Sequence, residues 1–360
     1  MADSHSAPTP ARLLQLIERM AGRPVAVLAD LVVDRFVSGT PKRISREAPV
    51  LILRYEGERI APGGGANAVA NIAALGGRPL TLGVVGDDES GRLLIAELES
   101  RGIATEGIRV RPDYRTPTKT RILGGAKGTI KQQIVRFDVE ETLTLDEGDR
   151  GHFRRQLAAW SGSALAEGAP AGVAVLSDYG YGTVETALVG ELRRALAGGG
   201  GTLVCDSRFR LAEFHGVDAA TPNEEEAELL YGGEIEGPEG AGPALHRSGT
   251  ELMERLGVRF LLITRGSGGL SLFLPGRSAH LPVHGTAQVA DVTGAGDTVI
   301  GTFALALAAG ASPLEAAALA DYAGGVVVMK TGTATLSPRE LAEAVEGDAK
   351  PLEELRWERS

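Results

Sequence analysis

Short apolar segments alternate with helix-like segments along most of the chain, and this alternation limits the possible folds more than any other feature. The apolar segments are PVAVLAD (24–30), PLTLGVVGD (79–87), GVAVLSDYG (172–180), GTLVCDSR (201–208) and RFLLITRG (259–266). Helix-like stretches lie between them at 89–101, 184–197 and 244–256. Continuous aliphatic runs joined by helices are typical of a parallel sheet buried on both faces, with right-handed crossovers. The sequence therefore predicts an α/β fold with a doubly wound, mostly parallel sheet and helices on both faces.

Polar residues stand at or near the ends of the apolar segments. They are Asp30, Asp87, Asp178, Asp206 and Thr264. In an open parallel sheet, the ligand-binding crevice lies beyond the carboxyl ends of the strands. We therefore expect these side chains to share one edge of the sheet and to face a ligand there.

Two segments interrupt this α/β rhythm. Residues 34–60 are rich in turn signals, and residues 117–139 read as a hairpin with the strands TKTRIL and IKQQIVRFD around GGAKG. The alternation in QQIVRFD is typical of strands buried on one face. We expect 34–60 and 117–139 to form a small β-sheet lid over the crevice of a single domain spanning 1–360. A simple extension of the main sheet is the alternative.

Charge and cysteine content exclude several classes of protein. Lys and Arg number 37 against 47 Asp and Glu, so we expect neither a basic face nor a nucleic-acid partner. The single cysteine, Cys205, excludes a disulfide within the chain and indicates a reducing cytoplasm. The N-terminal ARLLQLIERMAG is amphipathic, and the longest apolar run, 299–311, is shorter than the ~20 residues that span a bilayer. We expect no membrane partner.

Several common catalytic motifs do not occur in the sequence. It contains no GxxxxGK[ST], no HRD and DFG pair and no GxSxG. A P-loop nucleotide site, a protein-kinase site and an α/β-hydrolase nucleophile are therefore not expected.

One of two glycine-rich motifs is APGGGANAVANIAALGG, at 61–77. Its three consecutive glycines, Gly63, Gly64 and Gly65, directly precede an alanine-rich helix. A backbone without Cβ atoms can approach a ligand closely, and Asn67 and Asn71 lie one helical turn apart on the same face. A tight turn with close helix packing is the alternative interpretation.

The second motif, DVTGAGD at 291–297, points more directly to chemistry. Gly294, Ala295 and Gly296 would present consecutive backbone N–H groups to one point, at the positive end of the following helix. Such a nest can stabilise negative charge on a transferring phosphoryl group. Asp297 then lies where it could accept a proton from an attacking alcohol. A helix cap alone requires neither three small residues nor the aspartate and threonine that open the motif.

Together, the two motifs resemble the two signatures of the PfkB, or ribokinase-like, carbohydrate kinases, with similarity from about residue 22 to 340. Within that family, six stretches are most similar to the kinases that phosphorylate D-glycero-D-manno-heptose 7-phosphate at its anomeric oxygen. They are VVDRFVSGTPKRISREAPV, QQIVRFDVEE, VLSDYG, ATPNEEEAE, DVTGAGDTVIG and GGVVVMKTGTATLSP. The resemblance implies a doubly wound α/β kinase with a β-lid that transfers the γ-phosphate of ATP to a sugar or sugar-phosphate hydroxyl.

The resemblance also implies a role for each residue that matches the family pattern. The catalytic residues would be Asp297 as general base and Gly294, Ala295 and Gly296 as the anion hole. The substrate would be bound by Asp30, Asp34, Gly63, Gly64, Gly65, Asn67, Arg136, Asp178 and Arg208. The nucleotide would be bound by Asn223, Glu226, Thr264, Arg265, Gly266, Gly268 and Asp321. Asn223 and Glu226 would hold Mg²⁺ through water, and Asp291 and Thr293 resemble the family's monovalent-cation loop, for which K⁺ is the expected ion.

Some of these residues have a structural alternative. Asn223 and Glu226 also match a helix capping box, Arg265 also reads as a surface charge, and Arg136 also reads as a solvated strand residue. Asp321 stands where the family commonly has asparagine.

Two departures from the family concern the choice of sugar. Tyr181 stands where the heptose kinases carry lysine, and CDSRFR replaces their Asp-Pro-Lys, so that Arg208 or Arg210 is the nearest cation. A kinase of another, fructose- or ribose-like sugar is therefore an alternative. So is a non-catalytic sugar- or nucleotide-binding regulator on the same fold. The resemblance further implies a homodimer formed through the lid.

Overall fold

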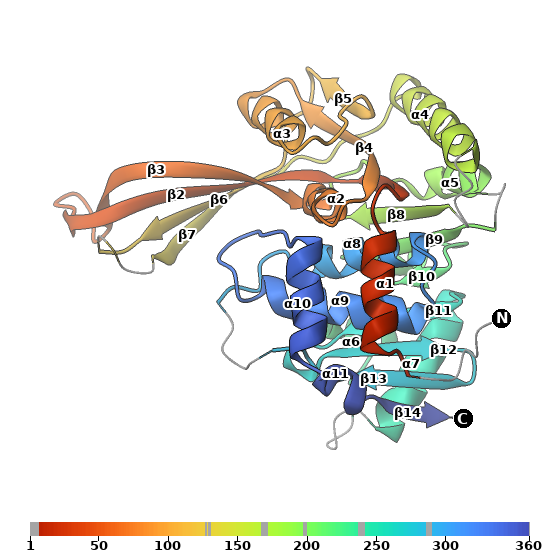
Figure 1. Cartoon of the computed structure of the whole chain (residues 1–360). Helices are drawn as coiled ribbons and strands as arrows, with labels where there is room; N and C mark the ends of the chain where they lie inside the picture. Colours follow the sequence, from red (N-terminus) through yellow and green to blue (C-terminus); the bar gives the residue numbers. More distant parts are fainter. Residues whose placement is uncertain are drawn as a thin grey trace.

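Two sheets organise the part of the chain that the structure describes, one with ten strands and one with four (Figure 1). This computed structural model describes residues 7–126, 128, 131–166, 172–196, 200–236, 242–285 and 290–359. The larger sheet has the order β14-β13-β12-β11-β10-β9-β8-β1-β4-β5. Its strands from β11 to β5 are parallel, and β12, β13 and β14 extend it as antiparallel strands.

The helices and strands have the following bounds. The helices are α1 (Pro10–Arg19), α2 (Gly65–Ala74), α3 (Glu89–Ser100), α4 (Glu147–Ala166), α5 (Val189–Leu196), α6 (Glu224–Tyr231), α7 (Pro243–Leu256), α8 (Ala295–Ala308), α9 (Pro313–Val327), α10 (Pro338–Gly347) and α11 (Lys350–Glu353). The strands are β1 (Pro24–Ala29), β2 (Leu31–Ile44), β3 (Leu51–Gly64), β4 (Arg78–Gly86), β5 (Ile108–Arg111), β6 (Thr118–Gly124), β7 (Gln132–Val139), β8 (Val173–Asp178), β9 (Thr202–Ser207), β10 (Ala219–Ala220), β11 (Phe260–Thr264), β12 (Leu270–Leu274), β13 (Arg277–Leu281) and β14 (Arg356–Arg359).

Strand β1 shows why the apolar runs carry no alternation. It lies between β4 and β8, and all of its residues are buried. Val25 and Val27 pack into one apolar cluster, whereas Ala26 and Leu28 pack into another on the opposite face of the sheet. Because successive side chains point to opposite faces, a strand covered on both sides must be apolar throughout.

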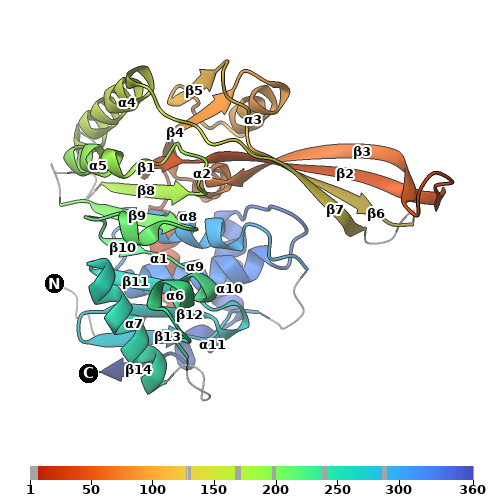
Figure 2. The same cartoon turned by 180° about the vertical axis from the view of Figure 1, so that it is seen from behind.

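Helices cover both faces of this sheet (Figures 1 and 2). Buried residues of α1, α2, α8, α9 and α10 join one cluster, and those of α5, α6 and α7 join the other, together with the N-terminal part of α4. The predicted fold class, a doubly wound and mostly parallel sheet with helices on both faces, is therefore confirmed. No helix in the described ranges is long and apolar enough to cross a membrane.

The smaller sheet, β3-β2-β6-β7, is the segment that we call the lid. Strands β2 and β3 pair along their full length as a long antiparallel ribbon, and β6 pairs parallel to β2. Figure 1 shows this ribbon extending beyond the helices and the main sheet. The connection between β6 and β7 includes residues 127, 129 and 130, which lie outside the described residues.

Strand β7 differs from the prediction of a strand with one buried face. Ile134, Val135 and Phe137 are 45%, 48% and 63% exposed. The alternation in QQIVRFD therefore does not mark burial here, because β7 is the edge strand of a ribbon that extends past the packed layers.

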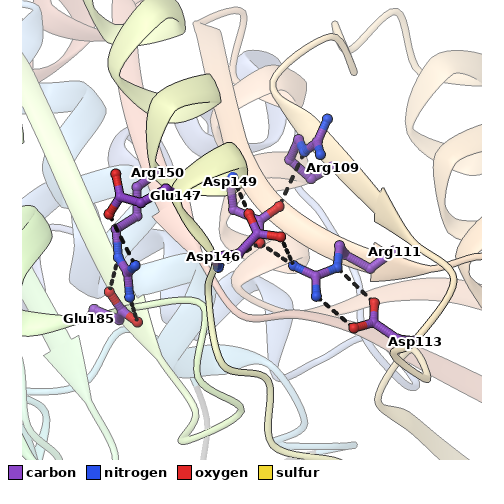
Figure 3. Close-up of polar contacts among 8 residues, drawn as sticks. All are labelled: Arg109, Arg111, Asp113, Asp146, Glu147, Asp149, Arg150 and Glu185. Atoms are coloured by element: carbon purple, nitrogen blue, oxygen red, sulfur yellow. Dashed lines mark hydrogen bonds and ion pairs between the residues drawn. The ribbon is translucent and has the colours of Figure 1, made fainter.

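A network of ion pairs joins β5, the edge strand of the main sheet, to the start of α4 (Figure 3). The Asp149 carboxylate is fully buried and accepts from Arg109 Nε (3.2 Å), from the Arg111 guanidinium and from the backbone N–H of Asp146 (3.1 Å). Arg111 also pairs with Asp113, which is exposed to solvent. Asp149 therefore anchors the first turn of α4 against the edge of the sheet.

Candidate active site

A crevice of about 640 Å³ lies between the lid and the carboxyl ends of the central strands. Its walls come from three regions that are far apart in the sequence. They include Lys119, Arg121 and Arg136 of the lid, Asp178, Asp206 and Thr264 at strand ends, and Val292, Thr293, Gly294, Gly296 and Asp297 of the second glycine motif. A second cavity, of about 720 Å³, lies on the lid beside residues 290–291 and 331–332. The strand-end residues line only the first of these two cavities, which is therefore the candidate active site.

The expectation that the strand-end residues share the crevice holds for three of five. Asp178, Asp206 and Thr264 line it. Asp87 instead lies at the surface, paired with Arg92 (2.9 Å).

Asp297 occupies the first turn of α8 and is 4% exposed. One carboxylate oxygen, Oδ1, accepts from the Tyr179 hydroxyl at 2.7 Å, and the other, Oδ2, accepts from Asn67 Nδ2 at 3.2 Å. Asn71 Nδ2 in turn donates to Asn67 Oδ1 at 3.2 Å. The two glycine motifs thus meet at Asp297, because the asparagines of α2 hold its carboxylate in place.

Glycine is required where the two motifs touch. Gly294 has φ of +79°, and a Cβ atom there would lie 2.4 Å from Asn67 Nδ2. Any other residue would combine a left-handed backbone conformation with a clash against the asparagine that holds Asp297. The sequence GAG therefore lets α8 begin in direct contact with α2.

Burial raises the pKa of Asp297 to about 7, well above the usual range of an aspartate. The hydrogen bonds from Tyr179 and Asn67 oppose this shift, because they stabilise the ionised carboxylate. The negative charge of Asp34 adds to the increase. A general base is most effective when its pKa is near the working pH, so Asp297 is suited to accept a proton at neutral pH.

Tyr179 is a site residue that the sequence analysis did not identify. It follows the end of β8 directly, in the SDYG stretch, and lines the crevice with its hydroxyl on Asp297. Its position after a strand end was the available signal, but several residues share that position.

We expect Tyr179→Phe to move the acidic limb of kcat/KM to higher pH by about one to two units. The lost hydrogen bond stabilises the ionised form of Asp297, and a hydrogen bond to a charged group is worth about 1.5–3 kcal/mol. A pH–rate profile from pH 5.5 to 9 measures the shift. Tyr181→Phe is the matched control, since the Tyr181 hydroxyl donates to Glu140 instead; an unshifted limb in Tyr179→Phe would contradict the assignment.

The predicted anion hole needs one correction. The N–H groups of Gly294 and Gly296 have no partner among the described residues, and both glycines line the crevice. The N–H of Ala295 donates to the carbonyl oxygen of Val292 at 3.2 Å and closes the turn, so it is not available to a ligand. The N–H of Asp297 is likewise unpaired in the described chain and takes the place of the third donor.

Asp30 does not face the crevice, and its predicted contact with sugar hydroxyls is wrong. It is fully buried, and its carboxylate accepts from the backbone N–H groups of Tyr179 (2.8 Å), Tyr181 (2.9 Å) and Thr183 (2.9 Å). Burial raises the pKa of Asp30, and these amides oppose the shift. Its role is to hold the loop after β8, which places Tyr179 at Asp297.

Asp34 and Asp178 line the crevice as predicted, each with a cationic partner. Asp34 lies in β2 and pairs with Arg121 across the lid. Asp178 accepts from Arg210 Nη2 (2.6 Å) and from Ser207 Oγ (2.6 Å). Both carboxylates are therefore fixed in orientation before any substrate binds.

The three glycines of the first motif have different surroundings. Gly64 lines the crevice, whereas a Cβ at Gly63 would lie 2.7 Å from Asp34 Oδ2 and one at Gly65 would lie 2.3 Å from Ala29 Cβ. For Gly63 and Gly65 the structure thus supports the alternative of close packing, because neither lines the crevice.

The two predicted substrate cations also lie at the crevice. Arg136 is half-exposed and is paired with Asp138 (3.0 Å), as the alternative of a solvated strand residue expects, yet it lines the crevice. Arg208 lines it without an ion pair to any described residue, and its guanidinium lies 5.5 Å from the centre of the Phe209 ring.

Asn223 and Glu226 line the crevice and also form the capping box of α6. Asn223 Oδ1 accepts from the N–H of Glu226 (2.8 Å), and Glu226 Oε2 accepts from the N–H of Asn223 (3.0 Å). The capping-box alternative is therefore confirmed, and it is compatible with the predicted Mg²⁺ role, because Glu226 Oε1 makes no hydrogen bond in the described chain and both residues line the crevice.

The carboxylates beside α6 fit a hydrated divalent cation. Burial raises the pKa values of Glu226 and Asp206, and in Asp206 the negative charges of Glu226 and Asp297 add to the increase. Mutually repelling carboxylates favour a bound cation. The described residues contain no cluster of three or more His, Cys, Asp or Glu that could hold a metal ion alone. The donor set therefore suits Mg²⁺ that keeps waters and shares its coordination with phosphates.

The four predicted nucleotide-binding residues at and after the end of β11 do not all lie at the crevice. Thr264 lines the crevice, but Arg265, Gly266 and Gly268 do not. The Arg265 guanidinium is buried, pairs with Glu236 and donates to the carbonyl oxygen of Gly268 at 3.1 Å. Arg265 is thus neither a surface charge nor a crevice residue, and it folds back to stabilise its own loop.

Asp321 is also a structural residue, and its predicted place beside the nucleotide is not supported. It is buried in α9, lines none of the cavities described above, and accepts from the backbone N–H of His284 at 3.1 Å. Burial raises its pKa well above the usual range.

Asp291 joins two loops and lines the second cavity, next to Val292 of the crevice. Its Oδ1 accepts from the N–H of Thr293 and its Oδ2 from the N–H of Gly332, both at 2.9 Å. Partial burial acts against ionisation, but these hydrogen bonds outweigh it and lower the pKa of Asp291. An ionised carboxylate between two backbone loops is compatible with a monovalent-cation site.

Comparison with known proteins identifies the fold and the family. Solved structures with this fold include phosphofructokinase-2 from Escherichia coli in complex with substrates and products (TM-score 0.69, 18% identity, covering 90% of this chain and 99% of that one). Another is Arabidopsis thaliana ribokinase complexed with ribose and ATP (TM-score 0.65, 20% identity, covering 90% and 99%). Identities this low establish the ribokinase-like fold alone.

Curated relatives are more similar in sequence. The bifunctional protein HldE of Mesorhizobium japonicum is 38% identical over 346 residues, covering 95% of this chain and 66% of the relative. The bifunctional protein HldE of Chromohalobacter salexigens is 40% identical over 324 residues, covering 89% and 63%. The chain thus spans slightly less than two thirds of the length of these relatives.

The family profile of the pfkB carbohydrate kinases matches residues 27–147 and 202–340. These ranges contain both glycine motifs, the lid and Asp297. Together with the identity to the curated relatives, this match shows that the chain belongs to the pfkB family of carbohydrate kinases.

Proposed function

We propose that the chain is an ATP-dependent sugar kinase that phosphorylates the anomeric hydroxyl of D-glycero-D-manno-heptose 7-phosphate. The observation that carries the kinase assignment is the buried Asp297 carboxylate, with a pKa of about 7, beside the unpaired amides of Gly294 and Gly296. The heptose assignment rests on the resemblance of the six sequence stretches to heptose kinases and on the 38–40% identity to the two HldE proteins.

The reaction follows from the geometry around Asp297. The acceptor hydroxyl would lie against the Asp297 carboxylate, with Asp34 and Asp178 oriented toward the sugar. Asp297 accepts the hydroxyl proton as the oxygen bonds to the γ-phosphorus and the bond to the leaving ADP breaks. The amides of Gly294, Gly296 and Asp297, with the helix dipole of α8 behind them, stabilise the charge on the transferring phosphoryl group.

The nucleotide would lie on the α6 side of the crevice. Thr264, Asn223 and Glu226 line that side. Mg²⁺ bound to the ATP phosphates supplies positive charge against the transferring group, and Glu226, Asn223 and Asp206 would hold it through water. Potassium at the Asp291 and Thr293 loop would fix the position of the amides that begin α8.

A homodimer through the lid is part of the proposal. Large apolar side chains of the ribbon are exposed, including Ile44, Tyr55 and Phe137 at 67%, 63% and 63%. A second copy covering them would remove this surface from water, which is the main driving force for association.

The proposed location of the chain is the cytoplasm. The proposed reaction consumes ATP, and Cys205 is a free, buried cysteine.

One assay distinguishes this proposal from two alternatives, a kinase of another sugar and a non-catalytic regulator. ADP release is measured with heptose 7-phosphate, heptose, fructose, ribose, fructose 6-phosphate and ribose 5-phosphate. Turnover that is fastest with heptose 7-phosphate supports the proposal, and turnover that is fastest with a fructose or ribose compound supports a kinase of another sugar. ATP binding without turnover on any acceptor would support a regulator and contradict the kinase proposal.

A further inference from the structure

The lid side of the crevice carries a group of positively charged side chains that the proposed chemistry does not use. Lys119 and Arg121 lie in β6, Arg136 lies in β7 and Arg208 follows β9, and all four line the crevice. Arg121 is paired with Asp34 and Arg136 with Asp138. Lys119 and Arg208 make no ion pair within the described residues. Two positive charges in this wall are therefore available to a ligand.

Lys119 is the more constrained of the two. Its ammonium lies 5.3 Å from the centre of the Tyr179 ring, in contact with the aromatic face. Burial lowers the pKa of Lys119, and the neighbouring charges of Arg208 and Arg136 lower it further, against the opposing effect of Asp34 and Asp138. A half-buried ammonium that other cations repel is unfavourable by itself. A bound anion between Lys119 and Arg208 would relieve both effects.

Lys119 and Asp297 contact the same tyrosine, Tyr179, and this arrangement limits the shape of a molecule that could reach both. Lys119 contacts the face of the Tyr179 ring, while the hydroxyl of the same ring donates to Asp297. A molecule that touches both the ammonium and the base must extend along this one tyrosine side chain. A sugar with its reacting hydroxyl at one end and an anionic group at the other has that form.

The nucleotide is the other phosphate-bearing molecule that the crevice would bind. The charges around its proposed side of the crevice differ from those around Lys119. The proposed nucleotide side carries Glu226 and Asp206 beside the start of α8, where a hydrated cation is needed to balance the charge. Lys119 is instead on the lid, where its charged neighbours besides Arg208 are Asp34, Arg136 and Asp138. Its surroundings favour the acceptor.

We propose that Lys119, with Arg208 beside it, binds a phosphate already carried by the acceptor, so that this site selects sugar phosphates over free sugars. The inference rests on the proposed kinase function and names the residue that selects its substrate class. Tyr181, which stands where the heptose kinases carry lysine, donates to Glu140 and does not line the crevice. Lys119 determines specificity and accepts no proton in the reaction, although its charge also lowers the pKa of Asp297.

The test compares Lys119→Met with the wild type on heptose 7-phosphate and on unphosphorylated heptose. A charge-assisted hydrogen bond is worth about 1.5–3 kcal/mol, so we expect KM for the phosphorylated sugar to rise roughly 10–100-fold. At pH 9, where Asp297 is ionised with or without the charge of Lys119, the kcat, the KM for ATP and the turnover of the free sugar should stay near their wild-type values. Lys119→Arg should restore most of the affinity for the sugar phosphate.

Lys131→Met is the matched control, because Lys131 is a second lid lysine that pairs with Glu56 and lines the other cavity. A rise in the KM for ATP alone would overturn the proposal by assigning Lys119 to the nucleotide. So would an equal loss on both sugars, or no change. Calorimetric titration with the sugar phosphate in the absence of ATP separates a failure of this proposal from a failure of the proposed kinase function. If Lys119→Met weakens this binding, the phosphate subsite is supported even where the wild type shows no turnover. The lack of turnover would then contradict only the kinase function.

Discussion

Replacing Asp297 with asparagine is expected to lower kcat by roughly 10²–10⁴, the usual scale for removing a general base. The side chain keeps its size, and both contacts persist if its Oδ1 accepts from Asn67 and its Nδ2 donates to the Tyr179 hydroxyl, so the start of α8 should fold unchanged. What is lost is the ability to accept the proton of the acceptor hydroxyl. The measurement is acceptor-dependent ADP release, combined with calorimetric determination of the Kd for ATP, which should change little.

Asp87→Asn is the matched control for this prediction. Asp87 also stands at the end of a strand of the main sheet, but it lies at the surface and pairs with Arg92. Its replacement should leave kcat within about twofold of the wild type, because the residue lies outside the crevice. Wild-type turnover in Asp297→Asn, at unchanged ATP affinity, would show that another group accepts the proton.

Replacing Asp149 with alanine is expected to destabilise the fold by about 3 kcal/mol. Asp149 is fully buried, and its loss leaves the Arg109 and Arg111 guanidinium groups without their common partner (Figure 3). Removing one member of a buried ion pair costs about 3–5 kcal/mol. We expect the low end of this range, since Arg111 keeps Asp113 and Asp146. Urea unfolding followed by circular dichroism measures the difference.

Asp113→Ala is the control for this second variant, because Asp113 pairs with the same arginine but its side chain is 64% exposed. An exposed pair contributes about 0–1 kcal/mol, so this variant should unfold close to the wild-type midpoint. Equal destabilisation by both substitutions would show that burial of Asp149 is not what anchors α4.

The main sheet was predictable because burial on both faces leaves a direct trace in the sequence. Every position of β1 and β8 is buried; β1 is apolar throughout, and β8 is apolar up to Leu176, before the polar Ser177 and Asp178 at its carboxyl end. The lid was predictable as a break in that pattern. The exposure of Phe137 was not, because alternation shows that two faces differ but not whether either face is covered.

The centre of the candidate site was predictable because motif and geometry coincide there. Gly294 and Asp297 belong to the same first turn of α8, so the helix start that could bind an anion also places the carboxylate. Asn67 came from the first motif, and Gly294 of the second motif allows α8 to approach it closely.

The periphery of the site depends on side-chain direction, which sequence position does not determine. Asp30 and Asp178 both stand at strand ends, yet Asp30 points to the backbone of the loop after β8 while Asp178 lines the crevice. Arg265 follows Thr264 directly but turns back to Glu236. Lys119 is one residue of a lid strand, and only the pairing of β6 with β2 places it against Tyr179.

The dependence of kcat/KM on pH tests most directly whether Asp297 is the base of a sugar kinase. A base with a pKa of about 7 must be ionised to act, so kcat/KM for the sugar acceptor should fall about tenfold per pH unit below 7 and level off above it. The fall of kcat/KM at low pH is caused by a group on the protein if it begins at higher pH in Tyr179→Phe and is absent from the residual activity of Asp297→Asn. Titration of the substrate cannot produce these differences, because it is the same for every variant. A profile that is flat from pH 6 to 8, or a limb that is identical in all three proteins, would contradict the account.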